Sequence, residues 1–171
     1  MEEVGIRINE QLLSSIKSYS FYKRLNNELN ELYKKYENVF ADVNDKQEAV
    51  ITIYCTENSQ FNKYEFIIGR GYPFRPPAIC YQDKPYIEFL KTKFFSKESK
   101  IAFEKVTGMN CFCCSSITCH TNWGPCITMD RIIKEIQLFK TKKRNIINKL
   151  MADKIKYKYL IDDIDLDSWL F

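Results

Sequence analysis

The sequence YPFRPP, residues 72–77, contains three of the chain's five prolines and decides which fold the neighbouring segments can form. A proline lacks a backbone N–H donor and disfavours helix in the residue before it. The segment is therefore predicted to be a rigid bend that holds Tyr72 and Phe74 in fixed directions. It stands between 63–69 (KYEFIIG) and 78–82 (AICYQ), and the patterns of both segments predict short strands.

A helix and a further strand are expected before this bend. Apolar residues in 21–36 (FYKRLNNELNELYKKY) recur at helical spacing, with Lys, Asn and Glu on the opposite face. A turn at 44–46 then precedes 48–55 (EAVITIYC), whose β-branched and apolar residues favour a strand. This strand and 63–69 form a predicted hairpin, so the sheet is expected to be a short antiparallel meander.

Helices are expected after the bend. Residues 83–109 are predicted to be irregular apart from a short helix near 87–94. Thr128 is a suitable N-cap for a helix over 129–139 (MDRIIKEIQLF), and 145–160 shows a second helical pattern. A helix, a small antiparallel sheet and then further helices make the predicted fold class α+β.

Composition limits the classes of protein to be considered. The chain has 171 residues, of which 45% are hydrophobic and 28% charged, so one globular domain with its own core is expected. No apolar run is long enough to span a bilayer, and the first residues lack the basic-then-apolar layout of a signal peptide. We therefore expect a cytoplasmic or nuclear protein without a membrane partner. In such a reducing compartment the seven cysteines are more naturally thiols or metal ligands than disulfides.

The cysteine-rich segment 110–125 (NCFCCSSITCHTNWGP) carries four of those cysteines and the only histidine. A nucleophilic thiol, a metal site and inert buried thiols are the alternatives. Cys111, Cys113, Cys119 and His120 supply the four ligands that zinc prefers. They lie on one short loop, however, and adjacent Cys113 and Cys114 are not expected to turn to one metal. We therefore expect no cofactor and keep zinc as the alternative.

Charge is concentrated towards the C-terminus. Residues 140–158 contain seven Lys and one Arg, and the last ten residues contain four Asp. A basic segment attracts nucleic acid, but this one lacks interleaved aromatic residues on which bases could stack. A solvated helix face followed by an acidic tail is the preferred interpretation, and nucleic acid is not an expected partner.

The order of these segments resembles the ubiquitin-conjugating enzyme family, whose fold is called UBC-like. The resemblance covers roughly residues 20 to 140 and rests on YPFRPP, on NWGPCIT (122–128) beside the family's WSPALT, and on the helix that begins TMDRIIKEIQ. It implies a leader over 1–19, a UBC-like core over 20–140, and a basic helix with an acidic tail over 141–171.

The resemblance also implies a chemistry. In that family a cysteine takes ubiquitin or a related modifier from an activating enzyme as a thioester, and then passes it to a lysine or to a ligase cysteine. Cys114 lies nine residues before Trp123, one more than in the family pattern, and is the implied nucleophile. Cys111 keeps the family's spacing from a preceding glycine, Gly108, and ranks second. Cys113 ranks third.

Two binding surfaces follow from the same resemblance. The surface expected to bind RING-type ligases comprises Phe74, Pro125 and Cys126. The surface expected to dock on the activating enzyme comprises Lys23, Arg24 and Asn27. Aromatic residues beside prolines also commonly pack into a core. Core packing is an equal alternative for Phe74 and the preferred interpretation for Trp123.

The sequence departs from the family at its His-Pro-Asn motif. Ile87, Glu88 and Phe89 occupy the corresponding positions. The family's asparagine amide helps to hold the active-site loop or to stabilise the oxyanion of the tetrahedral intermediate. Asn110 or Asn122 could supply an amide from elsewhere. A second function therefore stays open, namely a non-catalytic variant that binds ubiquitin or a ligase, with a structural zinc at the cysteines.

Overall fold

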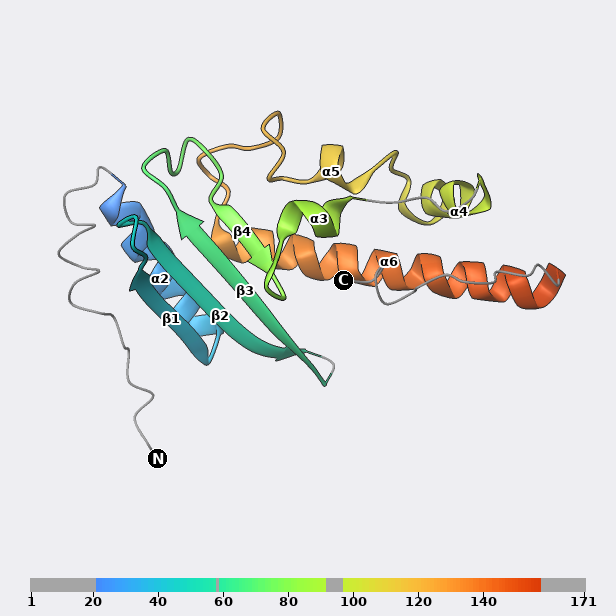
Figure 1. Ribbon diagram of the computed structural model, residues 1–171, viewed down its shortest axis with the longest axis horizontal. Helices are drawn as coiled ribbons and strands as arrows, with labels where there is room; N and C mark the ends of the chain where they lie inside the picture. Colours follow the sequence, from blue (N-terminus) through green and yellow to red (C-terminus); the bar gives the residue numbers. More distant parts are fainter. Residues whose placement is uncertain (1–20, 58, 92–96, 158–171) are drawn as a thin grey trace.

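The computed structural model describes residues 21–57, 59–91 and 97–157 (Figure 1). The expected leader over 1–19 and the acidic tail lie outside the described residues. In the described part, helix α2 (Tyr22–Lys35) precedes an antiparallel sheet, and helices follow the sheet. The fold is α+β, as the sequence predicts.

Helix α2 has one buried face. Leu25, Leu29 and Leu32 are almost completely buried on it, and Glu28 lies among them. Lys and Asn occupy exposed positions on the other side. This is the amphipathic pattern expected of a helix that covers a core, and the predicted helix over 21–36 is confirmed.

The sheet is a meander in which each strand pairs with the next one along the chain. Within the described residues its order is β1-β2-β3-β4-β5, antiparallel throughout. The strands are β1 (Asn38–Val43), β2 (Ala49–Glu57), β3 (Gln60–Ile68), β4 (Ala78–Tyr81) and β5 (Lys84–Pro85). Ile51 pairs with Phe66, and both are completely buried. Strand β1 was not among the predicted strands.

The proline segment forms the predicted bend between β3 and β4. Its Tyr72–Pro73 peptide bond is cis. Tyr72 is buried against Phe21 of the segment leading into α2, with ring centroids 6.0 Å apart. Phe74 is 79% exposed, so the interpretation of Phe74 as a core residue is wrong.

Of the helices predicted after the sheet, the short one near 87–94 is present over Tyr86–Leu90, whereas the others differ. The observed helices are α3 (Tyr86–Leu90), α4 (Lys97–Thr107), α5 (Phe112–Ser115) and α6 (Met129–Tyr157). Helix α4 falls in a stretch that was expected to be irregular. The two helices expected over 129–139 and 145–160 form the single helix α6, which passes residue 140 without a break. The residues between them, KTKKR, include neither Gly nor Pro, and Lys and Arg have high helix propensity.

The core fills the space between the sheet and the helices. Helix α6 runs below the shorter helices α3 and α5 in the view of Figure 1, and α4 packs against it further along. Ile132, Ile133, Ile136 and Phe139 of α6 are all buried. Of the described helices, none combines the length and the apolar character that crossing a membrane requires.

Candidate functional site: a cluster of three thiols

Helix α5 is fixed to the core by one aromatic side chain. Phe112 is completely buried between Phe103 of α4 and Phe139 of α6, with ring centroids 4.9 and 4.5 Å away. The residues on either side of it stay near the surface. Cys111 and Cys113 are half-buried, and Cys114 is exposed. A buried anchor therefore presents cysteines at the surface on a short, well-held turn.

The three cysteines expected as candidate nucleophiles lie together. The Sγ atoms of Cys113 and Cys111 are 3.3 Å apart, and those of Cys113 and Cys114 are 3.8 Å apart. All three Sγ atoms lie within 4.8 Å of one another. We call Cys111, Cys113 and Cys114 the thiol trio. The adjacent Cys113 and Cys114 were not expected to turn to one metal, yet their Sγ atoms lie close enough together to share one.

Hydrogen bonds within the thiol trio favour a negative charge on Cys111. Cys111 is the N-cap of α5, and its Sγ accepts the backbone N–H of Cys114 at 3.3 Å. Hydrogen bonds from Cys114 and then from Cys113 lower the pKa of Cys111. The same contacts with Cys111 and Cys113 raise the pKa of Cys114 to about 12. The thiolate is the reactive form of cysteine. The lowered pKa therefore favours Cys111 as the nucleophile, whereas exposure to solvent favours Cys114.

Glu135 of α6 holds the segment that follows α5. Its side chain is only 8% exposed. Its Oε1 accepts hydrogen bonds from Ser116 Oγ at 2.6 Å and Tyr86 Oη at 2.9 Å, and its Oε2 accepts the backbone N–H of Ile117 at 2.7 Å. Burial and then Glu135 raise the pKa of Tyr86, so this hydroxyl stays protonated and donates. One buried carboxylate therefore joins α6, α3 and the cysteine segment.

Asn122 braces the same segment from its other side. Its Nδ2 donates to the carbonyl oxygens of Cys114 at 2.8 Å and Ser116 at 2.9 Å. Asn110, the other amide considered, is exposed. Phe89, which the resemblance in sequence sets beside the asparagine of ubiquitin-conjugating enzymes, is buried and packs on Tyr81 with ring centroids 5.3 Å apart. Of these residues, Asn122 is therefore the one whose amide contacts the cysteine segment.

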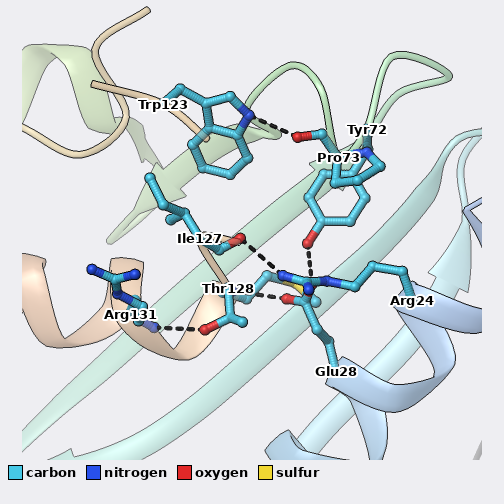
Figure 2. Close-up of polar contacts among 9 residues, drawn as sticks. Arg24, Glu28, Tyr72, Pro73, Trp123, Ile127, Thr128 and Arg131 are labelled. Carbon is cyan, nitrogen blue, oxygen red and sulfur yellow. Dashed lines mark hydrogen bonds and ion pairs between the residues drawn. The ribbon is translucent and has the colours of Figure 1, made fainter. Parts of the chain in front are cut away.

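Trp123 joins the cysteine segment to the proline bend. Its Nε1 donates to the carbonyl oxygen of Pro73 at 2.8 Å (Figure 2). The indole is half-buried and packs on the core, as preferred from the sequence. Among the expected ligase-binding residues, Phe74 follows Pro73 directly, whereas Pro125 and Cys126 follow Trp123. All three are exposed.

Glu28 of α2 ties the start of α6 to the proline bend. Its carboxylate accepts hydrogen bonds from Arg24 Nε at 2.5 Å, from Tyr72 Oη and from the backbone N–H of Met129 at 2.9 Å (Figure 2). Arg24 also donates to the carbonyl oxygen of Ile127 at 3.3 Å. Arg24, expected to dock on an activating enzyme, is thus engaged within the fold.

The other two residues of that expected docking surface are free of this network. Lys23 and Asn27 are both exposed on α2. Both are therefore accessible to a partner, whereas Arg24 is 33% exposed and paired with a buried carboxylate.

The other two ligands of the alternative zinc site, Cys119 and His120, lie outside the thiol trio. Cys119 Sγ is 3.3 Å from Thr121 Oγ1, and this hydrogen bond lowers the pKa of Cys119. His120 is exposed. Among the described residues, the thiol trio is the one group of three or more His, Cys, Asp or Glu side chains close enough to hold a metal ion.

Comparison of the chain with protein-family models, with curated proteins and with solved structures found no match. Its function is therefore inferred from the site itself and from the motifs in the sequence.

Glu28 and Glu135 were not singled out from the sequence, although each carries a recognisable signal. Glu28 falls within the apolar stripe of α2, directly before Leu29. Glu135 falls directly before Ile136 in the apolar stripe of α6. A carboxylate within a buried stripe needs hydrogen-bond partners, because burying an unpaired charge is costly. The sequence does not specify those partners, which come from distant segments.

Proposed function

We propose that the chain accepts ubiquitin or a ubiquitin-like modifier as a cysteine thioester and transfers it to a lysine or to a ligase cysteine. The observation that carries this proposal is the exposed Cys114 thiol on a turn held by Phe112, Asn122 and, through the following residues, Glu135. Acyl transfer requires a thiol that is accessible and yet fixed in direction. Cys114 is the proposed nucleophile.

The proposed reaction is two acyl transfers at one sulfur. The cysteine thiolate attacks the carbonyl carbon of the modifier's thioester on the activating enzyme. A new S–C bond forms, the old S–C bond breaks, and the activating enzyme's sulfur leaves as a thiolate that takes up a proton. A lysine amine or ligase thiolate then attacks the new thioester, and the cysteine leaves as thiolate. When the attacking group is the amine, its nitrogen loses one proton as the amide forms, and the departing thiolate takes up that proton. Neither step requires an oxidant or a metal.

The exposed residues around the site support the proposed partners. Phe74 is a large apolar side chain that the fold leaves in solvent, and such residues are common anchors in protein interfaces. Trp123 and Pro73 fix the two segments that carry Phe74, Pro125 and Cys126. These three residues are the proposed contact for a RING-type ligase. Lys23 and Asn27 are the proposed contact for the activating enzyme.

A non-catalytic variant that binds ubiquitin or a ligase is the second candidate function. Two observations favour it. The position of the family's asparagine is taken by the buried Phe89, and the raised pKa of Cys114 disfavours its thiolate. Both observations concern catalysis alone, so the exposed contact residues serve either function equally.

A charging assay tests the proposal. The full chain is incubated with an activating enzyme, ubiquitin and ATP, and is then run on gels with and without reductant. We expect a reductant-sensitive adduct that Cys114→Ser removes and Cys126→Ser, the matched exposed thiol, retains. An adduct that survives Cys114→Ser and disappears in Cys111→Ser transfers the role to Cys111. The assay is repeated with each ubiquitin-like modifier and its own activating enzyme. If no modifier forms an adduct but the chain still binds ubiquitin, catalysis is refuted and the second function is favoured.

A further inference from the structure

We propose that the thiol trio binds one thiophilic metal ion, of the class represented by zinc and monovalent copper, through all three sulfur atoms. This site differs from the zinc site kept as an alternative in the sequence analysis, since it uses Cys114 in place of Cys119 and His120. Soft thiolate ligands select zinc and monovalent copper over harder ions such as magnesium and calcium. The binding itself does not depend on the proposed acyl transfer.

The spacing of the sulfur atoms fits a metal ion. Zinc–thiolate bonds are about 2.3 Å long, so two thiolates on one tetrahedral zinc lie about 3.8 Å apart. The Sγ atoms of Cys113 and Cys114 are 3.8 Å apart, and those of Cys113 and Cys111 are 3.3 Å apart. The remaining pair is within 4.8 Å. The three separations between the sulfur atoms therefore lie within about 1 Å of the spacing on a tetrahedral zinc ion.

The surroundings of the thiol trio hold the ligands in place. Phe112 lies between Cys111 and Cys113 in sequence and is completely buried, so the backbone that carries them is anchored from below. The backbone N–H of Cys114 donates to Cys111 Sγ at 3.3 Å, and Asn122 Nδ2 donates to the Cys114 carbonyl at 2.8 Å. Such outer hydrogen bonds orient the ligands of metal sites.

The metal ion would keep an open coordination position. Cys114 is exposed, and Cys119 and His120 lie outside the thiol trio. Zinc with three protein ligands takes a water or an external ligand in its fourth position. A free thiol or the sulfur of a partner protein is therefore the class of ligand that this position would accept.

Metal binding to the full chain tests this proposal without any modifier or activating enzyme. The protein is reduced, stripped with a chelator and kept anaerobic. Zn²⁺ and Cu⁺ are then titrated separately against chromogenic chelators, and bound metal is measured after desalting. We expect each chain to bind one equivalent of Zn²⁺, of Cu⁺ or of each when titrated separately. Cys113→Ser should weaken the affinity for the bound metal by at least about 100-fold, since loss of outer hydrogen bonds alone costs 10–100-fold in metal affinity. Circular dichroism checks that the variant is folded.

Two control variants define the ligand set. Cys119→Ser and Cys126→Ser should retain stoichiometric binding. Cys111→Ser should lose stoichiometric binding. This second ligand variant keeps the test valid if Cys113→Ser alone fails to fold. Three results would each overturn the proposed three-thiol site. The first is that neither ion binds stoichiometrically, and the second is that folded Cys113→Ser and Cys111→Ser bind the metal as well as the unmodified chain does. The third is that Cys119→Ser loses the metal.

Discussion

Removal of the Glu135 carboxylate is the sharpest test of how the cysteine segment is held. In Glu135→Ala, Tyr86 Oη and the backbone N–H of Ile117 lose their acceptor, whereas Ser116 Oγ keeps Thr118 Oγ1 at 2.8 Å. Each buried donor left unsatisfied costs about 1–3 kcal/mol. Removing the carboxylate also removes its own desolvation penalty, which offsets part of this loss. We expect the free energy of unfolding to fall by about 3 kcal/mol.

Two measurements check this expectation. Urea denaturation gives the change in the free energy of unfolding. Hydrogen exchange gives protection at the backbone amides of residues 112–118, which should lose protection more than those of α2. Glu31→Ala is the matched control, because Glu31 is 58% exposed and pairs with the exposed Lys34 at 2.9 Å. That exposed pair should contribute no more than about 0.5 kcal/mol.

A loss below about 1 kcal/mol in Glu135→Ala would refute the reasoning, because the lost hydrogen bonds would then barely outweigh the desolvation penalty of the carboxylate. The reasoning would also be refuted if the free energy of unfolding fell by about 3 kcal/mol while hydrogen exchange over residues 112–118 did not change. That outcome would show that Glu135 stabilises the core generally and does not hold the cysteine segment.

Three further predictions concern the elements around the site. Glu28→Ala should lower the free energy of unfolding in urea by about 2–6 kcal/mol, since it leaves two buried donors, the Tyr72 hydroxyl and the backbone N–H of Met129, without their acceptor. Trp123→Phe keeps the apolar contact but loses the hydrogen bond to Pro73, so urea denaturation should show a loss of about 1 kcal/mol. Burial lowers the pKa of Lys143 from 10.5 to about 8, so the unfolded chain binds more protons between these pH values. Stability should therefore rise by up to about 3 kcal/mol across that interval relative to Lys143→Met, as measured by urea denaturation at successive pH values.

The sequence predicted the elements whose own residues determine them. Helix α2 follows from its apolar stripe, and the bend at 72–77 follows from prolines that restrict the backbone in any context. Strand β1 (NVFADV) was missed because Asn, Ala and Asp are poor strand formers, and the strand depends on pairing with β2. Helix α4 was missed because it buries little apolar surface, chiefly at Ala102 and Phe103.

The composition of the site was predicted better than its geometry. Cys111, Cys113 and Cys114 were all identified as candidates, but sequence spacing does not say where three sulfur atoms point. Their convergence depends on Phe112, whose burial between two helices turns the chain so that Cys111 caps the helix that Cys113 and Cys114 belong to. Contacts between segments distant in sequence decide that burial, and no local pattern specifies them.

The two proposals for the thiol trio make opposite demands on Cys114. Thioester formation needs its sulfur free, whereas a metal ion bound by all three thiols would occupy that sulfur. If both hold, metal-free protein should be charged with modifier and metal-loaded protein should not, with charging restored by a chelator. If metal-free and metal-loaded protein are charged equally well, the nucleophile lies outside the thiol trio, even though the chain both binds metal and accepts the modifier. Cys111→Ser separates the causes, because it should lose the metal while leaving Cys114 available for acylation.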